Sequence, residues 1–87
     1  MSEIRRTSAF PGFKEMAERR HSLAGELVEH RRVVGLSQTE VAARMGTSQS
    51  AVARLESGDA DIKFSTIERY VAALGLRIGW RLEGKGE

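Results

Sequence analysis

The sequence predicts a small all-α domain of four to five helices, followed by one C-terminal β-strand that pairs across a dimer. Between residues 11 and 75, short amphipathic segments alternate with glycines and with Ser residues that can cap helices. After Gly75 the apolar residues alternate strictly, which is typical of a strand. The length of 87 residues suffices for one domain with a modest core.

The composition limits the classes of function. The chain contains no Cys, which excludes disulfides and thiolate chemistry and leads us to expect a cytoplasmic protein. No segment approaches the ~20 apolar residues that cross a bilayer, so no membrane partner is expected. The net charge of +2 permits nucleic-acid binding without demanding it.

The first part of the chain is predicted to be an arm followed by helix. Residues 1–10 are expected to be a flexible N-terminal arm, and residues 11–75 the helical domain. Ser22 could begin a new helix, so the pattern leaves open whether residues 11–34 form one helix or two. The apolar stripe of this region, which fits one helical face, consists of Phe13, Met16 or Ala17, Leu23, Leu27 and Val34.

A second, short helix is predicted after Gly35. Ser37 is expected to cap it, with Glu40 three residues later as the capping-box partner, and Gly46 to end it. Its buried side is predicted to consist of Val41, Ala42 and Met45.

The next helix is also short, and either Thr47 or Ser48 could cap it. Val52 and Leu55 are expected to face inward. The outward residues are Ser48, Gln49, Ser50, Ala53 and Arg54. Short side chains let a helix enter the DNA major groove, where Gln can bond adenine and Arg can bond guanine O6 and N7. Two short helices joined by a tight turn are the helix-turn-helix arrangement.

The last helix is predicted after the turn ESGDAD, with Ser65 as its cap and Gly75 at its end. Its inward residues are Ile67, Val71 and Leu74. Residues 76–83 are then expected to form a dimerisation strand, because a lone apolar strand needs a partner, and residues 84–87 a tail. The predicted dimer interface consists of Leu76, Ile78, Trp80 and Leu82.

The stretch GLSQTEVAARMGTSQSAVARLESG, followed by FSTIERYVAALGL, resembles the Xre/Cro–cI-type helix-turn-helix regulators, which include the lambdoid phage repressors. The resemblance covers about Leu23–Leu76 and implies a lambda-repressor-like bundle. It also implies a buried ion pair between Arg31 and Glu56. The base contacts that it implies are Gln49, Ser50 and Arg54, and the phosphate contacts are Gln38, Thr47 and Ser48. Given the low net charge, we add only Arg44 and Lys63 as phosphate contacts beyond the helix ends.

The C-terminal stretch ALGLRIGWRLE resembles a narrower group, the antitoxins of the HigA and HipB kinds. In these proteins a strand follows the fourth helix, and in HipB-type dimers it pairs across subunits. The resemblance implies a cognate toxin protein as a further partner.

These observations predict a homodimeric DNA-binding repressor that recognises an inverted repeat in double-stranded DNA. An antitoxin that also neutralises a protein toxin and autoregulates its operon is a second interpretation, and a protein-interaction module without DNA binding is a third. Arg5 and Arg6 could enter a minor groove or belong to a plain flexible tail.

No enzyme chemistry is expected. The sequence has no nucleophile elbow and no glycine-rich phosphate loop, so it offers no catalytic residues and no cofactor site. His21 and His30 lie nine residues apart without any Cys, so no metal site is predicted.

Overall fold

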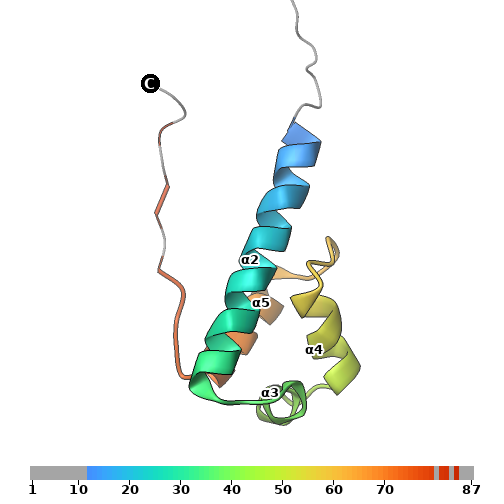
Figure 1. Cartoon of the computed structure of the whole chain (residues 1–87), viewed down its shortest axis with the longest axis vertical. Helices are drawn as coiled ribbons and strands as arrows, with labels where there is room; N and C mark the ends of the chain where they lie inside the picture. Colours follow the sequence, from blue (N-terminus) through green and yellow to red (C-terminus); the bar gives the residue numbers. More distant parts are fainter. Residues whose placement is uncertain (1–11, 80, 83, 85–87) are drawn as a thin grey trace, which may run out of the picture.

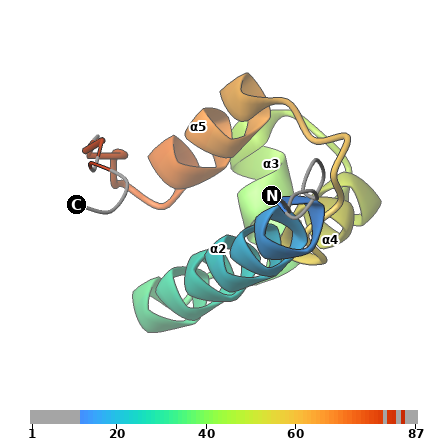
Figure 2. The same cartoon turned by 90° about the horizontal axis from the view of Figure 1, so that it is seen from above.

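The computed structural model describes residues 12–79, 81, 82 and 84, and in this part of the chain it contains four helices. They are α2 (Gly12–Val34), α3 (Gln38–Met45), α4 (Gln49–Glu56) and α5 (Phe64–Ala73). The long α2 stands upright in Figure 1, with α3 and α4 near its lower end. The view from above in Figure 2 shows α3 between α2 and α5. The predicted all-α fold class is therefore confirmed for the described residues.

Helix α2 is continuous over residues 12–34, which settles the question of one helix or two for that range. The apolar stripe of α2 is only partly covered, because Met16, Leu23 and Val34 are 53%, 42% and 43% exposed. Among the stripe residues whose burial the structure describes, only Leu27 belongs to the core, where Ala24 is also buried. Met16 is exposed because the first turns of α2 extend beyond the other helices (Figure 1).

The predicted capping of α3 is confirmed in both directions. Ser37 Oγ accepts a hydrogen bond from the Glu40 N–H at 3.0 Å, and Glu40 Oε1 accepts one from the Ser37 N–H at 2.7 Å. Gly46 ends the helix in the left-handed conformation, with φ of 73°, which glycine adopts at little cost. The N-cap of α4 is Ser48 rather than Thr47, because Ser48 Oγ accepts the N–H of Ala51 at 3.1 Å.

The prediction that Ser65 caps α5 is wrong. The helix already begins at Phe64, and its N-cap is Lys63, which makes no capping hydrogen bond through its side chain. The reason is in the backbone, since the N–H groups of Thr66 and Ile67 both donate to the Lys63 carbonyl. The loop backbone, and not a side chain, therefore sets where α5 starts.

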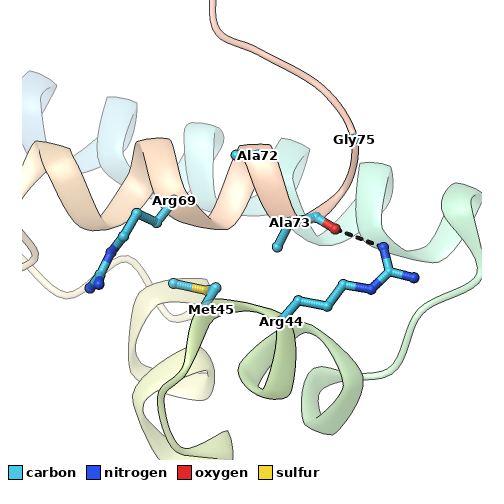
Figure 3. Close-up of a pocket in the computed structure, with 6 residues that line it drawn as sticks. All are labelled: Arg44, Met45, Arg69, Ala72, Ala73 and Gly75. Carbon is cyan, nitrogen blue, oxygen red and sulfur yellow. Dashed lines mark hydrogen bonds between the residues drawn. The ribbon is translucent and has the colours of Figure 1, made fainter.

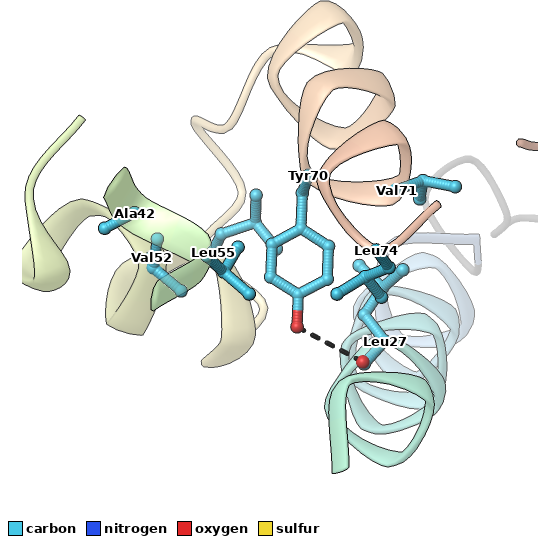
Figure 4. Close-up of a cluster of buried hydrophobic side chains, with 8 residues drawn as sticks. Leu27, Ala42, Val52, Leu55, Tyr70, Val71 and Leu74 are labelled. Atoms are coloured by element: carbon cyan, nitrogen blue, oxygen red, sulfur yellow. Dashed lines mark hydrogen bonds between the residues drawn. The ribbon is translucent and has the colours of Figure 1, made fainter. Parts of the chain in front are cut away.

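The core lies where the four helices meet. It is built from eight buried side chains, namely Leu27, Val41, Ala42, Val52, Leu55, Tyr70, Val71 and Leu74 (Figure 4). The predicted inward residues of α3, α4 and α5 are all among them, except Met45 and Ile67, which are half-buried and pack against the cluster. Tyr70 was not predicted. Its side chain is fully buried, and its hydroxyl oxygen lies 3.2 Å from the Leu27 carbonyl oxygen.

The C-terminal segment differs from the prediction. No strand is present among residues 76–79, 81 and 82 of the single chain, because a β-ladder needs the N–H and C=O groups of a second strand. Ile78 instead packs against the helical core, whereas Leu82 is 94% exposed. The pairing of this segment across a dimer stays a prediction. Trp80, the arm over residues 1–10, and residues 85–87 of the predicted tail lie outside the described part of the chain.

Candidate nucleic-acid interface

The α3–turn–α4 unit gives α4 one buried face and one exposed face. Val52 and Leu55 on α4 are buried against Val41 and Ala42 on α3, which fixes the two helices relative to each other. On the opposite side, Gln49, Ser50 and Arg54 are exposed. The structure therefore brings the predicted base-contacting residues together on one solvent-facing surface of α4.

A partly buried cluster of hydrogen bonds centred on Glu56 supports this surface. Arg31 donates to both carboxylate oxygens of Glu56, with Nε–Oε2 at 2.6 Å and Nη2–Oε1 at 3.1 Å. The two side chains are only 12% and 5% exposed, so the implied ion pair exists in the structure and is largely shielded from water. Arg31 also donates from Nη1 to the Leu36 carbonyl at 2.9 Å, which leaves its guanidinium well satisfied.

Two further donors complete the Glu56 cluster, so that it joins all four helices. The Tyr70 hydroxyl from α5 donates to Oε2 at 2.5 Å, and Gln38 Nε2 from α3 donates to Oε1 at 2.8 Å. Burial alone would raise the pKa of Glu56, but the hydrogen bonds from Arg31, Tyr70 and Gln38 outweigh it and lower that pKa. Glu56 is therefore a carboxylate at neutral pH, and burial together with this carboxylate raises the pKa of Tyr70.

The Glu56 cluster also orients two amides at the surface. A carboxylate only accepts hydrogen bonds, so Gln38 must direct its NH2 group toward Glu56. Its Oε1 then faces Gln49, whose Nε2 donates to it at 2.5 Å. A chain of hydrogen bonds thus runs from the buried ion pair to the first residue of α4.

A second arginine–carboxylate pair lies on the surface of α4. Arg54 donates from Nε and Nη2 to Asp59 Oδ2, at 2.9 Å and 2.5 Å. The Arg54 side chain is nevertheless 61% exposed, so it remains accessible to a ligand. The hydrogen bond from the Asp61 N–H, and then the contact with Arg54, lower the pKa of Asp59. Sequence analysis missed Asp59, although an Asp directly after a Ser-Gly turn is a signal for side-chain-to-backbone bonding.

The predicted phosphate contacts are scattered over the structure. Thr47 and Ser48 lie in the turn before α4, and the Ser48 hydroxyl is within 3.2 Å of the Ser50 hydroxyl. Lys63 is exposed at the start of α5. Arg44 donates from Nη1 to the Ala73 carbonyl at 3.0 Å, so its guanidinium lies at the end of α5 near Gly75 (Figure 3). Met45 and Arg69 line the same pocket farther along the helix.

In the described residues, no group of three or more His, Cys, Asp or Glu is placed to hold a metal ion. His21 instead packs against the turn after α4, since a Cβ at Gly58 would lie 2.6 Å from His21 Cδ2. None of the helices in the described segments is long and apolar enough to cross a membrane.

These features define a helix-turn-helix protein, and comparison with known proteins agrees. A helix-turn-helix family model matches residues 29–81, and the chain belongs to this family, as its sequence predicts. The chain is 41% identical over 75 residues to antitoxin HigA1 of Mycobacterium tuberculosis, a match that covers 86% of this chain and 50% of that protein.

A second relative from the same organism, putative antitoxin HigA3, is 50% identical over 60 residues. This match covers 64% of this chain and 55% of that protein. The chain thus spans about half the length of the curated relatives it matches. No solved structure matches the chain.

Proposed function

We propose that the chain is a sequence-specific DNA-binding transcriptional regulator and not an enzyme. The observation that carries this proposal is the amphipathic character of α4. Its apolar face is buried against α3, and its exposed face bears Gln49, Ser50 and Arg54. A helix presented in this way can enter the major groove, where glutamine and arginine side chains distinguish base pairs by hydrogen bonding.

Phosphate contacts would fix the position of α4 on the duplex. Gln38 is the first residue of α3 and Ser48 caps α4, after Thr47. The hydrogen bond between Gln38 and Gln49 joins these two N-termini, and helix N-termini favour phosphate groups. Gln38 uses one amide N–H for Glu56, which leaves the other for a phosphate oxygen. Arg44 and Lys63 would add charge contacts at the edges of this surface, Arg44 after leaving the Ala73 carbonyl.

The regulator acts as a repressor in this proposal, and two relatives favour a second role for it. HigA1 is named as an antitoxin and HigA3 as a putative antitoxin, and their matches cover 86% and 64% of this chain. We infer that the chain neutralises a protein toxin and represses its own operon. Failure to capture any toxin with the full chain from its native host would contradict this role and leave DNA binding intact.

The active form is a homodimer in this proposal, assembled through residues 76–83. Leu82 is 94% exposed and Leu76 is 43% exposed, so apolar side chains in this segment are available to a second copy. Deletion of residues 76–87 should give a monomer in sedimentation experiments. A truncated protein that remains dimeric would show that another surface forms the interface.

Selection from random duplexes followed by footprinting tests DNA recognition. The expected site is an inverted repeat whose half-site centres are ~10–10.5 base pairs apart, or a multiple of that, because two symmetric recognition helices must enter successive major grooves. Arg54→Ala should lose ~1–3 kcal/mol of binding and relax one position in each half-site.

Arg19→Ala is the matched control, because Arg19 carries the same charge and is also exposed, on α2 outside the α3–α4 unit. An unchanged base preference in Arg54→Ala would remove Arg54 from the base contacts. A wild-type protein that protects no DNA would favour the interpretation as a protein-interaction module.

A further inference from the structure

The bridge between Arg54 and Asp59 leaves a specific part of the guanidinium free. Arginine has five N–H donors in a rigid fork. Asp59 takes the Nε donor and one Nη2 donor, which point to the same side of the group. The remaining Nη2 donor and its Nη1 neighbour form a parallel pair at the end of the side chain. A parallel pair of donors is what guanine O6 and N7 accept in the major groove.

Two hydrogen bonds and a constrained turn fix the position of Asp59. Its Oδ1 accepts the N–H of Asp61 at 2.8 Å, and its own N–H donates to the Arg54 carbonyl. The preceding Gly58 has φ of 81°, and His21 leaves no room for a Cβ at that position. The turn after α4 is therefore built so that the Asp59 carboxylate lies beside the Arg54 side chain.

We propose that Asp59 is a specificity-determining positioning residue, which holds the Arg54 guanidinium end-on for contact with a guanine base. An arginine without such a partner is a flexible cation that can bond any nearby phosphate, and phosphate contacts carry no sequence information. The Asp59 carboxylate restricts Arg54 to one geometry, so its contribution appears as selectivity for guanine. This inference rests on the proposed DNA contact of α4.

The variant Asp59→Asn tests the inference with little change of shape. The Asn Oδ1 can still accept the Asp61 N–H, which places the Nδ2 group opposite Arg54. Two donors then face each other, so the contact with Arg54 is lost. Asp61→Asn is the matched control, because it removes the same charge from the same turn and keeps the backbone N–H that Asp59 accepts.

Base preference is measured for the three proteins by selection from random duplexes and by titration of single-base variants of the selected site. Asp59→Asn should lose about tenfold in preference for guanine at the Arg54 position, which is near the lower end of what a bidentate contact contributes. Asp61→Asn should keep the wild-type preference. Both variants should bind unrelated DNA slightly more tightly than the wild type, and by the same amount, because each removes one negative charge near the duplex.

A second measurement needs no DNA. The Arg54 Nε–H resonance of the free protein should shift and exchange faster with water in Asp59→Asn, and should stay unchanged in Asp61→Asn. An unchanged resonance would overturn the bridge itself.

The results separate the inference from the function on which it rests. If the wild type selects no site, the proposed function fails and the inference fails with it. If the wild type selects a site and Asp59→Asn keeps its guanine preference, only the inference is overturned. A sharper guanine preference in Asp59→Asn would mean that Asp59 competes with the base for Arg54, which also overturns it.

Discussion

Helix α4 takes part in two arginine–carboxylate pairs that share the same chemistry but differ in their surroundings. Glu56, at its last residue, pairs with Arg31 in a site where the side chains are 5% and 12% exposed. Arg54, two residues earlier on the outer face, pairs with Asp59, and these side chains are 61% and 25% exposed. The first pair belongs to the framework of the domain, and the exposed pair lies on the surface proposed for DNA recognition.

Exposure to water explains why the two pairs serve different purposes. An exposed pair gains little free energy, because water screens the attraction and both side chains lose rotamer freedom on pairing. A buried pair is costly to disrupt, because removal of one partner leaves the other charge in a poorly solvated site. The Arg54–Asp59 pair therefore adds little to stability and orients an exposed side chain, whereas the Arg31–Glu56 pair joins four helices.

The largest expected effect is the loss of Arg31. Arg31→Ala should lower the free energy of unfolding by about 3 kcal/mol or more, because the Glu56 carboxylate remains buried without its cation. Urea denaturation measures this change. Arg32→Ala is the matched control, since Arg32 is the exposed neighbour on the same helix and should have almost no effect. Equal losses in the two variants would contradict the distinction between buried and exposed pairs.

A smaller loss is expected from Tyr70→Phe. The ring continues to fill the core, but the hydroxyl that donates to Glu56 and lies 3.2 Å from the Leu27 carbonyl is removed. Removal of a hydrogen bond to a charged group should lower the free energy of unfolding by about 2 kcal/mol. A variant as stable as the wild type in urea would show that Arg31 and Gln38 suffice to stabilise the Glu56 carboxylate.

The buried pair should also make stability depend on pH. The folded-state pKa of Glu56 is lowered, so its contribution is fully present above the unfolded-state pKa of about 4.3 and is lost as the pH falls through the folded-state value. Thermal unfolding should be followed from about pH 6 to about pH 3, a range that spans the usual pKa of a glutamate. The unfolding temperature should fall toward the acid end of this range.

Glu56→Gln is the test variant for this pH dependence, and its stability should fall less steeply with acid. It retains some slope, because the pKa values of Glu40 and Asp59 are lowered in the folded state as well. A slope identical to that of the wild type would mean that Glu56 does not titrate differently in the two states.

The smallest expected effect on stability is that of the exposed pair. Arg54→Ala should leave the midpoint of urea denaturation nearly unchanged, because exposed ion pairs contribute little. The same variant is expected to weaken DNA binding clearly, so stability and recognition should separate at this residue. A large loss of stability in Arg54→Ala would show that the bridge to Asp59 also supports the fold.

The sequence predicts the central part of the fold well, because that part depends on local signals. Ser37 and Glu40 meet through the backbone of a single helical turn, and Gly46 is required by its left-handed conformation. The inward residues Val52 and Leu55 follow from helical spacing alone. These features are encoded within a few residues of one another, and they are found as predicted.

The differences arise where distant segments decide the outcome. An apolar stripe shows which face of a helix could be buried, but the neighbours decide how far, which is why Met16 and Leu23 on α2 are exposed. Tyr70 belongs in the core because Glu56, from another helix, accepts a hydrogen bond from its hydroxyl group. Asp59 reaches Arg54 because of the turn at Gly58, which helical periodicity does not describe.

The anchoring of Arg54 by a residue outside the recognition helix has a consequence for redesign. If Arg54 alone is exchanged for a neutral side chain, the Asp59 carboxylate stays behind beside the DNA and repels the phosphates of every sequence. Transplanting the outward residues of α4 onto a related domain would fail in the same way if the turn were left out. If Asp59 positions Arg54 as proposed, the transferable unit of specificity extends from Gln49 to Asp61, and engineered libraries should vary positions 54 and 59 as a pair.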